Sequence, residues 1–194
     1  MDTLISIGIS CYESIKIETV LCLLHAIEKL GDVKLHLNFR KGVYVHDNRN
    51  FIVDEALKAG ATHLMFIDTD VTFEPDGIMK LLSANKDIIG GMYNMRSLPL
   101  TTTIKFIDDK GDFVKASADS IPKVPFRCYA VPTGFTLIRL ECLKKIPKPY
   151  FEFSTWKGKL MGEDVRFCQK ANEAGIEVWC DPTIRIGHIG EYLY

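Results

Sequence analysis

Apolar and polar positions alternate along the chain in two different rhythms. Short segments with the pattern of β-strands occur at residues 4–10, 34–39, 63–67 and 87–91. After the first run, apolar residues recur every three or four positions, the spacing of one helix face, at Ile17, Val20, Leu21, Leu24 and Ile27. This alternation of strands and helices predicts a parallel sheet with helices on its faces.

Capping and breaking residues set the limits of the helices expected in the first half. Ser14 is expected to be the N-cap of the first helix, which should end at Gly31. The polar segment 45–50 is predicted to be a loop before a second helix at 51–59, and Pro75 should open a short third helix. Sheets of this kind bind ligands at the carboxyl ends of their parallel strands.

The pattern changes in the second half, where turn residues and prolines separate shorter runs. Residues 101–116 are expected to form a β-hairpin that turns at 109–111. A strand, a short helix, an aromatic loop, an amphipathic helix and a last strand should follow, at 134–140, 141–146, 149–156, 162–175 and 176–182. We therefore expect one compact α/β domain over residues 1–194, with a parallel first half and more antiparallel pairing in the second.

Composition and charge narrow the classes of function. The net charge is −1 with acids and bases mixed along the chain, which argues against nucleic-acid binding because such proteins show a basic excess. No apolar window reaches the length of a membrane span. The six cysteines form no C-x-x-C pair and sit mostly in apolar runs, as expected for buried thiols in a reducing compartment, so we expect a cytoplasmic protein.

Two aspartates at the end of an apolar strand are the first candidate for chemistry. The chain has neither G-x-G-x-x-G after its first strand nor a G-x-x-x-x-G-K-S/T loop, so a bound nucleotide would need another counter-charge. Asp68-Thr69-Asp70 could supply it by holding Mg²⁺ or Mn²⁺, which bind one or two carboxylates together with substrate phosphates. The alternative is a strand-end turn in which both aspartates cap backbone N–H groups.

A second cluster lies nearly a hundred residues downstream. Glu163 and Asp164 open the last predicted helix, where acidic residues also occur simply because the helix dipole favours them. His188 lies between glycines in the segment Ile-Gly-His-Ile-Gly and could add an imidazole ligand to a manganese site begun by the aspartates, or be an ordinary structural histidine. The aromatic loop at 149–156 could stack on sugar faces or simply fill the core.

The joint order of these pieces resembles the GT-A glycosyltransferases, most of all the family-2-like inverting group and its short bacterial, phage and large-virus relatives. The shared pieces are a first strand that enters Ser-Cys-Tyr, an Arg-Asn pair, an apolar strand that ends in Asp-Thr-Asp, the segment GEDVRFCQKANEAG and a late histidine. The resemblance spans roughly residues 4–190. It implies a Rossmann-like mixed sheet with helices on both faces.

The same resemblance implies a metal-dependent transfer of a sugar from a UDP- or GDP-sugar to an acceptor hydroxyl. Asp68 and Asp70 match the D-x-D motif that holds Mn²⁺ or Mg²⁺ on the donor diphosphate, with Asp70 as the more direct ligand. His188 matches a late histidine that binds the same metal in some members. Asp164 matches the base of inverting members, and Glu163 would orient the acceptor or the base.

Further contacts with the nucleotide-sugar are implied at strand ends, for Cys11, Tyr12, Glu13, Arg49, Asp68, Thr69, Gly91 and Gly134. Residues 1–95 would form the nucleotide-binding half, and residues 96–194 the half that binds a glycan or other hydroxyl acceptor. The chain departs from the family where its first strand ends in Ser-Cys-Tyr-Glu, and it stops six residues after His188. It would then be a minimal enzyme or one domain of a longer protein.

Two other functions remain open at this point. One is a non-catalytic domain that binds a nucleotide-sugar or glycan. The other is a sugar nucleotidyltransferase, although the segment Gly-Ile-Ser-Cys-Tyr-Glu-Ser lacks the glycine-rich basic loop usual after the first strand of those enzymes. The donor sugar and the choice between inversion and retention also remain open.

Overall fold

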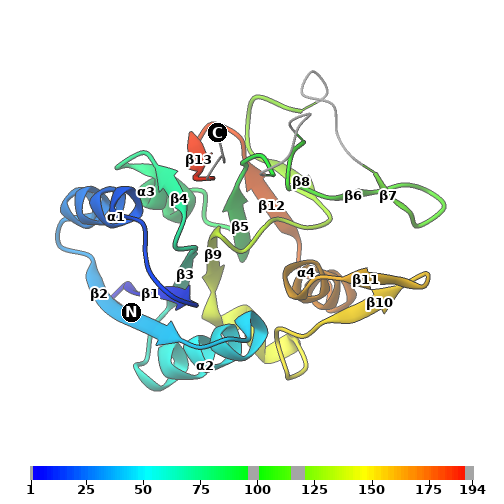
Figure 1. Cartoon of the computed structure of the whole chain (residues 1–194), viewed down its shortest axis with the longest axis horizontal. Coiled ribbons are helices and arrows are strands. Elements are labelled where there is room, and N and C mark those ends of the chain that lie inside the picture. The colour runs from blue at the N-terminus through cyan, green and yellow to red at the C-terminus, as the bar shows by residue number, and fades with distance from the viewer. Residues whose placement is uncertain (1, 96–100, 115–120, 191–194) are drawn as a thin grey trace.

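A seven-stranded mixed sheet forms the centre of the fold (Figure 1). The computed structural model describes residues 2–95, 101–114 and 121–190. The strands of the sheet are β1 (Leu4–Cys11), β2 (Lys34–Lys41), β3 (His63–Ile67), β5 (Ile88–Gly91), β8 (Phe126–Cys128), β9 (Phe135–Arg139) and β12 (Val178–Asp181). Their order across the sheet is β2-β1-β3-β9-β5-β12-β8, so strands from the two halves of the sequence alternate at its centre.

The direction of the strands changes along the sheet. Strand β1 pairs in parallel with both β2 and β3, as the alternating pattern of the first half predicts. Strand β9 is antiparallel to both of its neighbours, β3 and β5. Strand β12 is parallel to β5 and antiparallel to β8. The sheet therefore confirms the predicted mixed α/β architecture.

Helices cover both faces of this sheet. On one face, α1 (Ile17–Leu30) and α3 (Gly77–Ser83) pack over a core that includes Met65 and Ile67. On the other face, α2 (Val45–Lys58), α4 (Glu163–Glu173) and a 3₁₀ helix at Leu140–Lys145 pack over a core that includes Leu64 and Phe66. Because side chains of a strand point alternately to opposite faces, the four apolar residues of β3 supply both cores.

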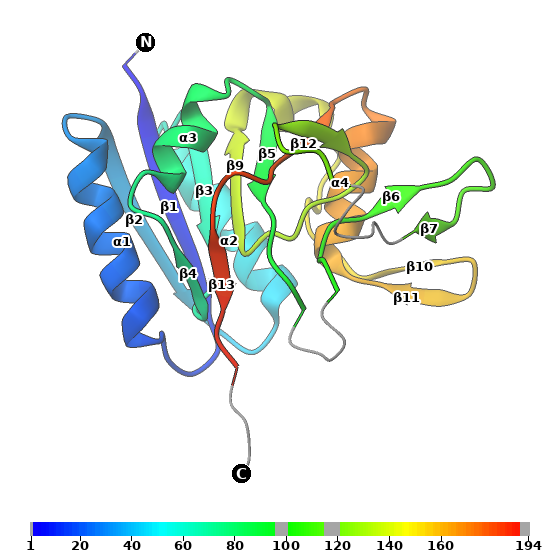
Figure 2. The same ribbon diagram turned by 90° about the horizontal axis from the view of Figure 1, so that it is seen from above.

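Three short antiparallel pairs stand outside the main sheet. Strand β4 (Val71–Phe73) pairs with β13 (Ile186–His188) beside the end of β3. Strand β6 (Phe106–Ile107) pairs with β7 (Phe113–Val114), and β10 (Ser154–Trp156) pairs with β11 (Lys159–Met161). These two hairpins extend together from the side of the molecule that carries α4 (Figure 2). The pairing of β4 with β13 brings the C-terminal part of the described chain to the end of β3.

Several predicted boundaries are correct because glycine governs them locally. Helix α1 ends at Gly31 with a φ of 58°, and the β6–β7 turn contains Gly111 with a φ of 72°. Both angles lie in the left-handed region that glycine adopts without a steric penalty. Of the hairpin predicted at 101–116, the structure has the part at 106–114, whereas Thr102 and Lys105 form bridges with Asn94 and Ala130 instead. Residues 115 and 116 lie outside the described residues.

The predicted start of α1 and the predicted loop before α2 are both wrong. Helix α1 begins at Ile17 after Lys16, whose backbone N–H donates to the Thr69 carbonyl oxygen at 2.9 Å, so a tertiary contact replaces the expected Ser14 cap. Residues 45–50 are the first turns of α2 rather than a loop. Their polar side chains turn inward, as Asn48 and Arg49 are buried, and this hides the usual amphipathic pattern.

The aromatic loop predicted at 149–156 divides into two parts. Phe151 is fully buried, with ring centroids 5.4 Å from Phe66 and 4.7 Å from Phe167, so it fills the core. Residues Ser154–Trp156 form strand β10, whose hairpin turns through Lys157 and Gly158 with φ angles of 48° and 77°. None of the helices in the described part of the chain has the length and apolar character needed to cross a membrane.

Candidate active site at the end of strand β3

The Asp68-Thr69-Asp70 segment is held in place by its backbone. Asp68 N–H donates to the Gly134 carbonyl oxygen at 2.9 Å. The Thr69 carbonyl oxygen accepts hydrogen bonds from the Lys16 N–H and the Thr19 hydroxyl, at 2.9 and 3.1 Å. The Asp70 carbonyl oxygen accepts from the N–H of residue 189 at 2.8 Å. Because three separate segments of the chain hold these three residues, both carboxylates are presented in a defined direction.

Arg49 joins the two acidic clusters that the sequence suggested. Its Nη2 donates to Asp68 Oδ1 at 3.1 Å, and its Nη1 donates to Glu163 Oε1 in a short contact. The arginine side chain is only 6% exposed. Its Nε lies buried without a hydrogen-bond partner among the described residues. Residues 68 and 163, far apart in sequence, thus share one buried cation.

Negative charge is in excess around this arginine. Burial lowers the pKa of Arg49, but the charges of Asp68, Glu163 and Asp164 outweigh it and raise that pKa above its ordinary value. Burial raises the pKa of the Tyr93 hydroxyl well above its ordinary value, and Asp68 adds to the effect. Three carboxylates therefore surround one guanidinium group, an arrangement that favours binding of a further cation.

His188 lies against Asp70, as the sequence predicted for two ligands of one metal. Its Nδ1 is 3.1 Å from the Asn94 carbonyl oxygen, which can only accept, so Nδ1 carries the proton in this hydrogen bond. The Nε2 atom is then the one that faces Asp70 Oδ1, at 3.7 Å. This separation is longer than a hydrogen bond. In this tautomer the Nε2 lone pair is directed towards Asp70, an orientation in which both side chains could bind one metal ion.

The residues fit a divalent cation only as a partial set of ligands. Asp70 and His188 are adjacent, whereas the side chain of Asp68 contacts Arg49. In residues 2–95, 101–114 and 121–190, no group of three His, Cys, Asp or Glu side chains is arranged to hold a metal ion. Two protein ligands still suit Mg²⁺ or Mn²⁺ when substrate phosphates and water complete the shell. The metal set of Asp68, Asp70 and His188 stays a prediction.

A cavity of about 200 Å³ opens in front of these groups. It is lined by residues of four segments: Ser10, Tyr12, Gly42, Val43, Val45, Asn48, Arg49, Asp68, Thr69 and Asp70. Tyr12 is 62% exposed, which leaves its ring face open to a stacking partner. Asn48 donates to Ser10 Oγ at 3.1 Å and to the Gly42 carbonyl oxygen at 2.9 Å, and so ties α2 to the ends of β1 and β2. The cavity lies at the carboxyl ends of parallel strands.

Glu163 and Asp164 occupy the first turn of α4. Asp164 Oδ1 accepts a hydrogen bond from the Val165 N–H at 2.7 Å, which orients the carboxylate at the positive end of the helix dipole. Glu163 is buried and bonded to Arg49. The two neighbours therefore differ in role: Glu163 anchors the helix to Arg49, and Asp164 is half-buried beside the same charge cluster.

Other predicted site residues separate into two groups. Gly134 lies directly behind the aspartates, where an added Cβ would lie 2.6 Å from Asp68 Oδ2 and 2.2 Å from the Tyr93 hydroxyl, so only glycine allows this approach. Cys11 and Glu13 are not among the described residues that line the cavity. An added Cβ on Gly91 would lie 2.1 Å from Ile186 Cδ1, so this glycine serves the packing of β13.

Sequence reasoning missed two residues that shape this site. Tyr93 is buried, and its ring centroid is 5.1 Å from that of His188 in an edge-on contact. Asn94 holds the histidine through its carbonyl oxygen. They lie two and three residues after the end of β5, so the signal available in the sequence was their place near a strand end, where polar residues of such sheets often line a site.

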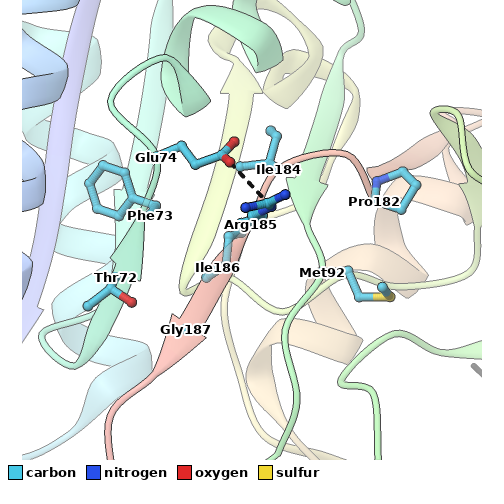
Figure 3. A pocket seen from close by; sticks show the side chains of 9 residues that line it. All are labelled: Thr72, Phe73, Glu74, Met92, Pro182, Ile184, Arg185, Ile186 and Gly187. Carbon is cyan, nitrogen blue, oxygen red and sulfur yellow. Dashed lines mark ion pairs between the residues drawn. The ribbon is translucent and has the colours of Figure 1, made fainter.

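A second cavity, of about 500 Å³, lies along the β4–β13 pair (Figure 3). Its lining includes one acidic and one basic side chain, Glu74 and Arg185, which face one another with 3.7 Å between Oε1 and Nε. Glu74 also accepts a hydrogen bond from Lys80 at 3.0 Å. The charged side chains that line this second cavity are therefore paired within the protein, in contrast to the excess of negative charge around Arg49.

The buried Glu163 should make stability depend on pH. Burial raises its pKa above the ordinary 4.5, although Arg49 opposes the shift. The folded protein then keeps the proton in a range where the unfolded chain has lost it, so stability falls as pH rises from 4.5 through the raised pKa. We expect the free energy of unfolding of the wild type, relative to Glu163→Gln, to decrease across that range in urea titrations. An increase would mean that the Arg49 pairing dominates and that the pKa is lowered.

Comparison with known proteins supports the fold without adding a function. No protein-family model matches this chain, and no curated protein does. Among solved structures, the crystal structure of A197 from STIV is similar, with a TM-score of 0.64 and 19% sequence identity over 98% of this chain and 87% of that chain. Identity this low indicates a shared fold alone. The α/β fold is thus confirmed.

Proposed function

We propose that this protein is a metal-dependent glycosyltransferase that moves a sugar from a nucleotide-diphosphate sugar to an acceptor hydroxyl. One observation carries the proposal: Asp68, Asp70, Glu163 and Asp164 gather around one arginine and one histidine at the carboxyl ends of parallel strands. This excess of negative charge suits a divalent cation together with a diphosphate. It agrees with the resemblance to GT-A glycosyltransferases in the order of the motifs.

The donor would lie in the cavity lined by Tyr12, Arg49 and Asp68. Tyr12 offers a ring face for the base, and Arg49 places a positive charge at the wall of the cavity, which attracts a phosphate group. Asp70 and His188 would hold the Mn²⁺ or Mg²⁺ ion. The chemistry that such an ion supplies when bound is neutralisation of the charge that builds on the departing diphosphate.

Asp164 would act as the general base in an inverting displacement. Its carboxylate is oriented by the Val165 N–H at the start of α4 and would accept a proton from the attacking hydroxyl. Glu163 would position this residue by anchoring the start of α4 to Arg49. All six cysteines are free thiols, which supports action in a reducing compartment, and we propose the cytoplasm.

Nucleotide release from a panel of UDP-, GDP- and dTDP-sugars in the presence of Mn²⁺ tests this proposal. Asp70→Ala is expected to weaken Mn²⁺-dependent binding of UDP or GDP by at least about tenfold, because a bound metal contributes ligand affinity on this scale or above. Calorimetry with Mn²⁺ alone gives a readout independent of activity. Asp76→Ala, which removes an exposed carboxylate paired with Lys80, is the matched control and should leave binding unchanged.

Three outcomes would contradict the proposal in different ways. Failure to bind or hydrolyse every donor, or equal behaviour of Asp70→Ala and the wild type, would remove the catalytic interpretation. Binding of a donor without transfer to any acceptor would favour a non-catalytic nucleotide-sugar or glycan-binding domain. Formation of a nucleotide-sugar from a nucleoside triphosphate and a sugar phosphate would identify a nucleotidyltransferase.

A further inference from the structure

Two hairpins distant in sequence are bound to one another beside the start of α4 (Figure 2). Trp156 Nε1 donates to the Gly111 carbonyl oxygen at 3.1 Å. Lys157 Nζ donates to the Lys110 carbonyl oxygen and to Asp112 Oδ1, each at 2.8 Å. Direct hydrogen bonds thus join the β6–β7 turn to the β10–β11 turn. The space between the two hairpins is therefore bounded by turns that are hydrogen-bonded to each other.

A pocket of about 420 Å³ lies between these hairpins and the first turn of α4, and we call it the hairpin pocket. This volume is in the range of small-molecule sites in proteins. Phe113 and Trp156 form an aromatic wall, with ring centroids 5.9 Å apart. Gly162 also lines the pocket and directly precedes Glu163 and Asp164. An added Cβ on Gly162 would lie 2.9 Å from Asp164 Oδ1, so the pocket ends beside the proposed base, whereas the donor cavity is lined by a different set of residues.

The hairpin pocket carries excess positive charge, although the chain as a whole carries a net charge of −1. Its lining includes three lysines and one aspartate: Lys105, Lys157, Lys159 and Asp112. Lys157 pairs with Asp112, so these two charges compensate one another. Neither Lys105 nor Lys159 makes an ion pair with another residue in the described parts of the chain. Two lysines without an ion pair in the described parts of the chain therefore line the same pocket as the two aromatic rings.

We propose that the hairpin pocket binds the acceptor, and that this acceptor is an anionic sugar that carries a carboxylate or a phosphate. The assignment to an acceptor rests on the proposed function. Trp156 and Phe113 offer faces for the C–H surface of a sugar ring. Lys105 and Lys159 attract the anionic group, which selects against neutral sugars. Gly162 lies next to the Asp164 carboxylate, so a hydroxyl bound at this end of the pocket would lie near the proposed base.

Fluorescence of Trp156 tests this proposal without any nucleotide or metal. The chain has two tryptophans, so Trp179→Phe leaves Trp156 as the only tryptophan reporter, within the pocket itself. The probes are phenyl β-D-glucuronide and its neutral counterpart phenyl β-D-glucoside, then glucose 6-phosphate and glucose. We expect each anionic probe that binds to do so about tenfold more tightly than its neutral partner, because two partly exposed ion pairs contribute on this scale. The preference should weaken as salt rises.

Substitution of the two lysines makes the test specific. Lys105→Ala with Lys159→Ala should abolish the preference for anionic probes, whereas Lys105→Arg with Lys159→Arg should retain it. The matched control is Lys58→Ala with Lys144→Ala, which removes two exposed lysines outside the pocket and should change nothing. A response to the glucuronide alone or to the phosphate alone supports the proposal and identifies the anionic group.

The outcomes separate this inference from the proposed function. Equal affinity for charged and neutral probes, or no response of Trp156 to any of the four, would overturn the inference even if donor sugars are hydrolysed. A clear anionic preference together with failure of every donor would leave the hairpin pocket as an anionic-sugar site in a protein that is not a glycosyltransferase. Binding and donor hydrolysis are measured on the same folded chain, so each result stands alone.

Discussion

Replacement of Asp164 by asparagine is expected to reduce the rate of sugar transfer by about 10²- to 10⁴-fold, the usual contribution of a positioned general base. Donor affinity should stay within about twofold, because Asp164 does not line the donor cavity. The amide oxygen of asparagine can still accept the hydrogen bond from the Val165 N–H, so the start of α4 should keep its structure. The lower transfer rate would then result from the loss of the general base rather than from unfolding.

The measurement is a comparison of single-turnover transfer with calorimetric binding of UDP or GDP. Glu173→Gln is the matched control because it neutralises an exposed carboxylate at the far end of the same helix, and it should transfer at the wild-type rate. Equal loss of nucleotide binding and transfer in Asp164→Asn would give Asp164 a structural role. An unchanged rate would show that another group accepts the proton.

Arg49→Ala is expected to lower the free energy of unfolding by about 3–5 kcal/mol, the scale measured when one partner of a buried ion pair is removed. The substitution leaves the buried Glu163 without its cation and removes the contact with Asp68. It also removes a guanidinium group that lies 5.9 Å from the centroid of the Phe151 ring. This loss of unfolding free energy should become smaller below about pH 5, because protonated carboxyl groups are neutral and are stable without a neighbouring cation.

Urea unfolding with a double substitution checks the cause of this loss. Glu163→Gln combined with Arg49→Ala should recover part of the stability, since it removes the uncompensated carboxylate. Arg127→Ala is the control, because its pair with Glu177 spans 3.5 Å between side chains that are 62% and 51% exposed. Such a surface pair contributes at most about 1 kcal/mol. If Arg49→Ala and Arg127→Ala lose equal stability, the buried pair has no special role.

The sequence predicted those elements whose signals are local. An apolar run that ends in Asp-Thr-Asp identified β3 and the residues after it, and Gly31 identified the end of α1. Prediction from the sequence failed where contacts with distant residues override local preference. The first turns of α2 have a polar sequence because they face the site, where Arg49 meets a glutamate 114 positions away. Phe151 lies in a loop as expected, but the sequence left open whether its ring fills the core, which the structure shows it does.

The residues of the candidate site also divide into those that the sequence identified and those that it did not. Asp68, Asp70, Asp164 and His188 were named from motifs, because carboxylates at a strand end and acids at a helix start are visible in a single chain. The link between the two acidic clusters through Arg49 was not visible. Tyr93 and Asn94, which position His188, carry no motif of their own. The pairing of the β6–β7 and β10–β11 turns was also hidden, since the hairpin pocket depends on contacts across some forty-five positions.

The sequence by itself determined the alternation of strands and helices and the chemical types available at the strand ends. These follow from hydrophobic periodicity and from backbone preferences that act over a few residues. Only the tertiary structure decided which of those groups meet. Strand β9 inserts between β3 and β5, and β13 pairs with β4, so that His188 reaches Asp70. Such pairings depend on the burial of both faces of the sheet, a property of the whole chain rather than of any segment.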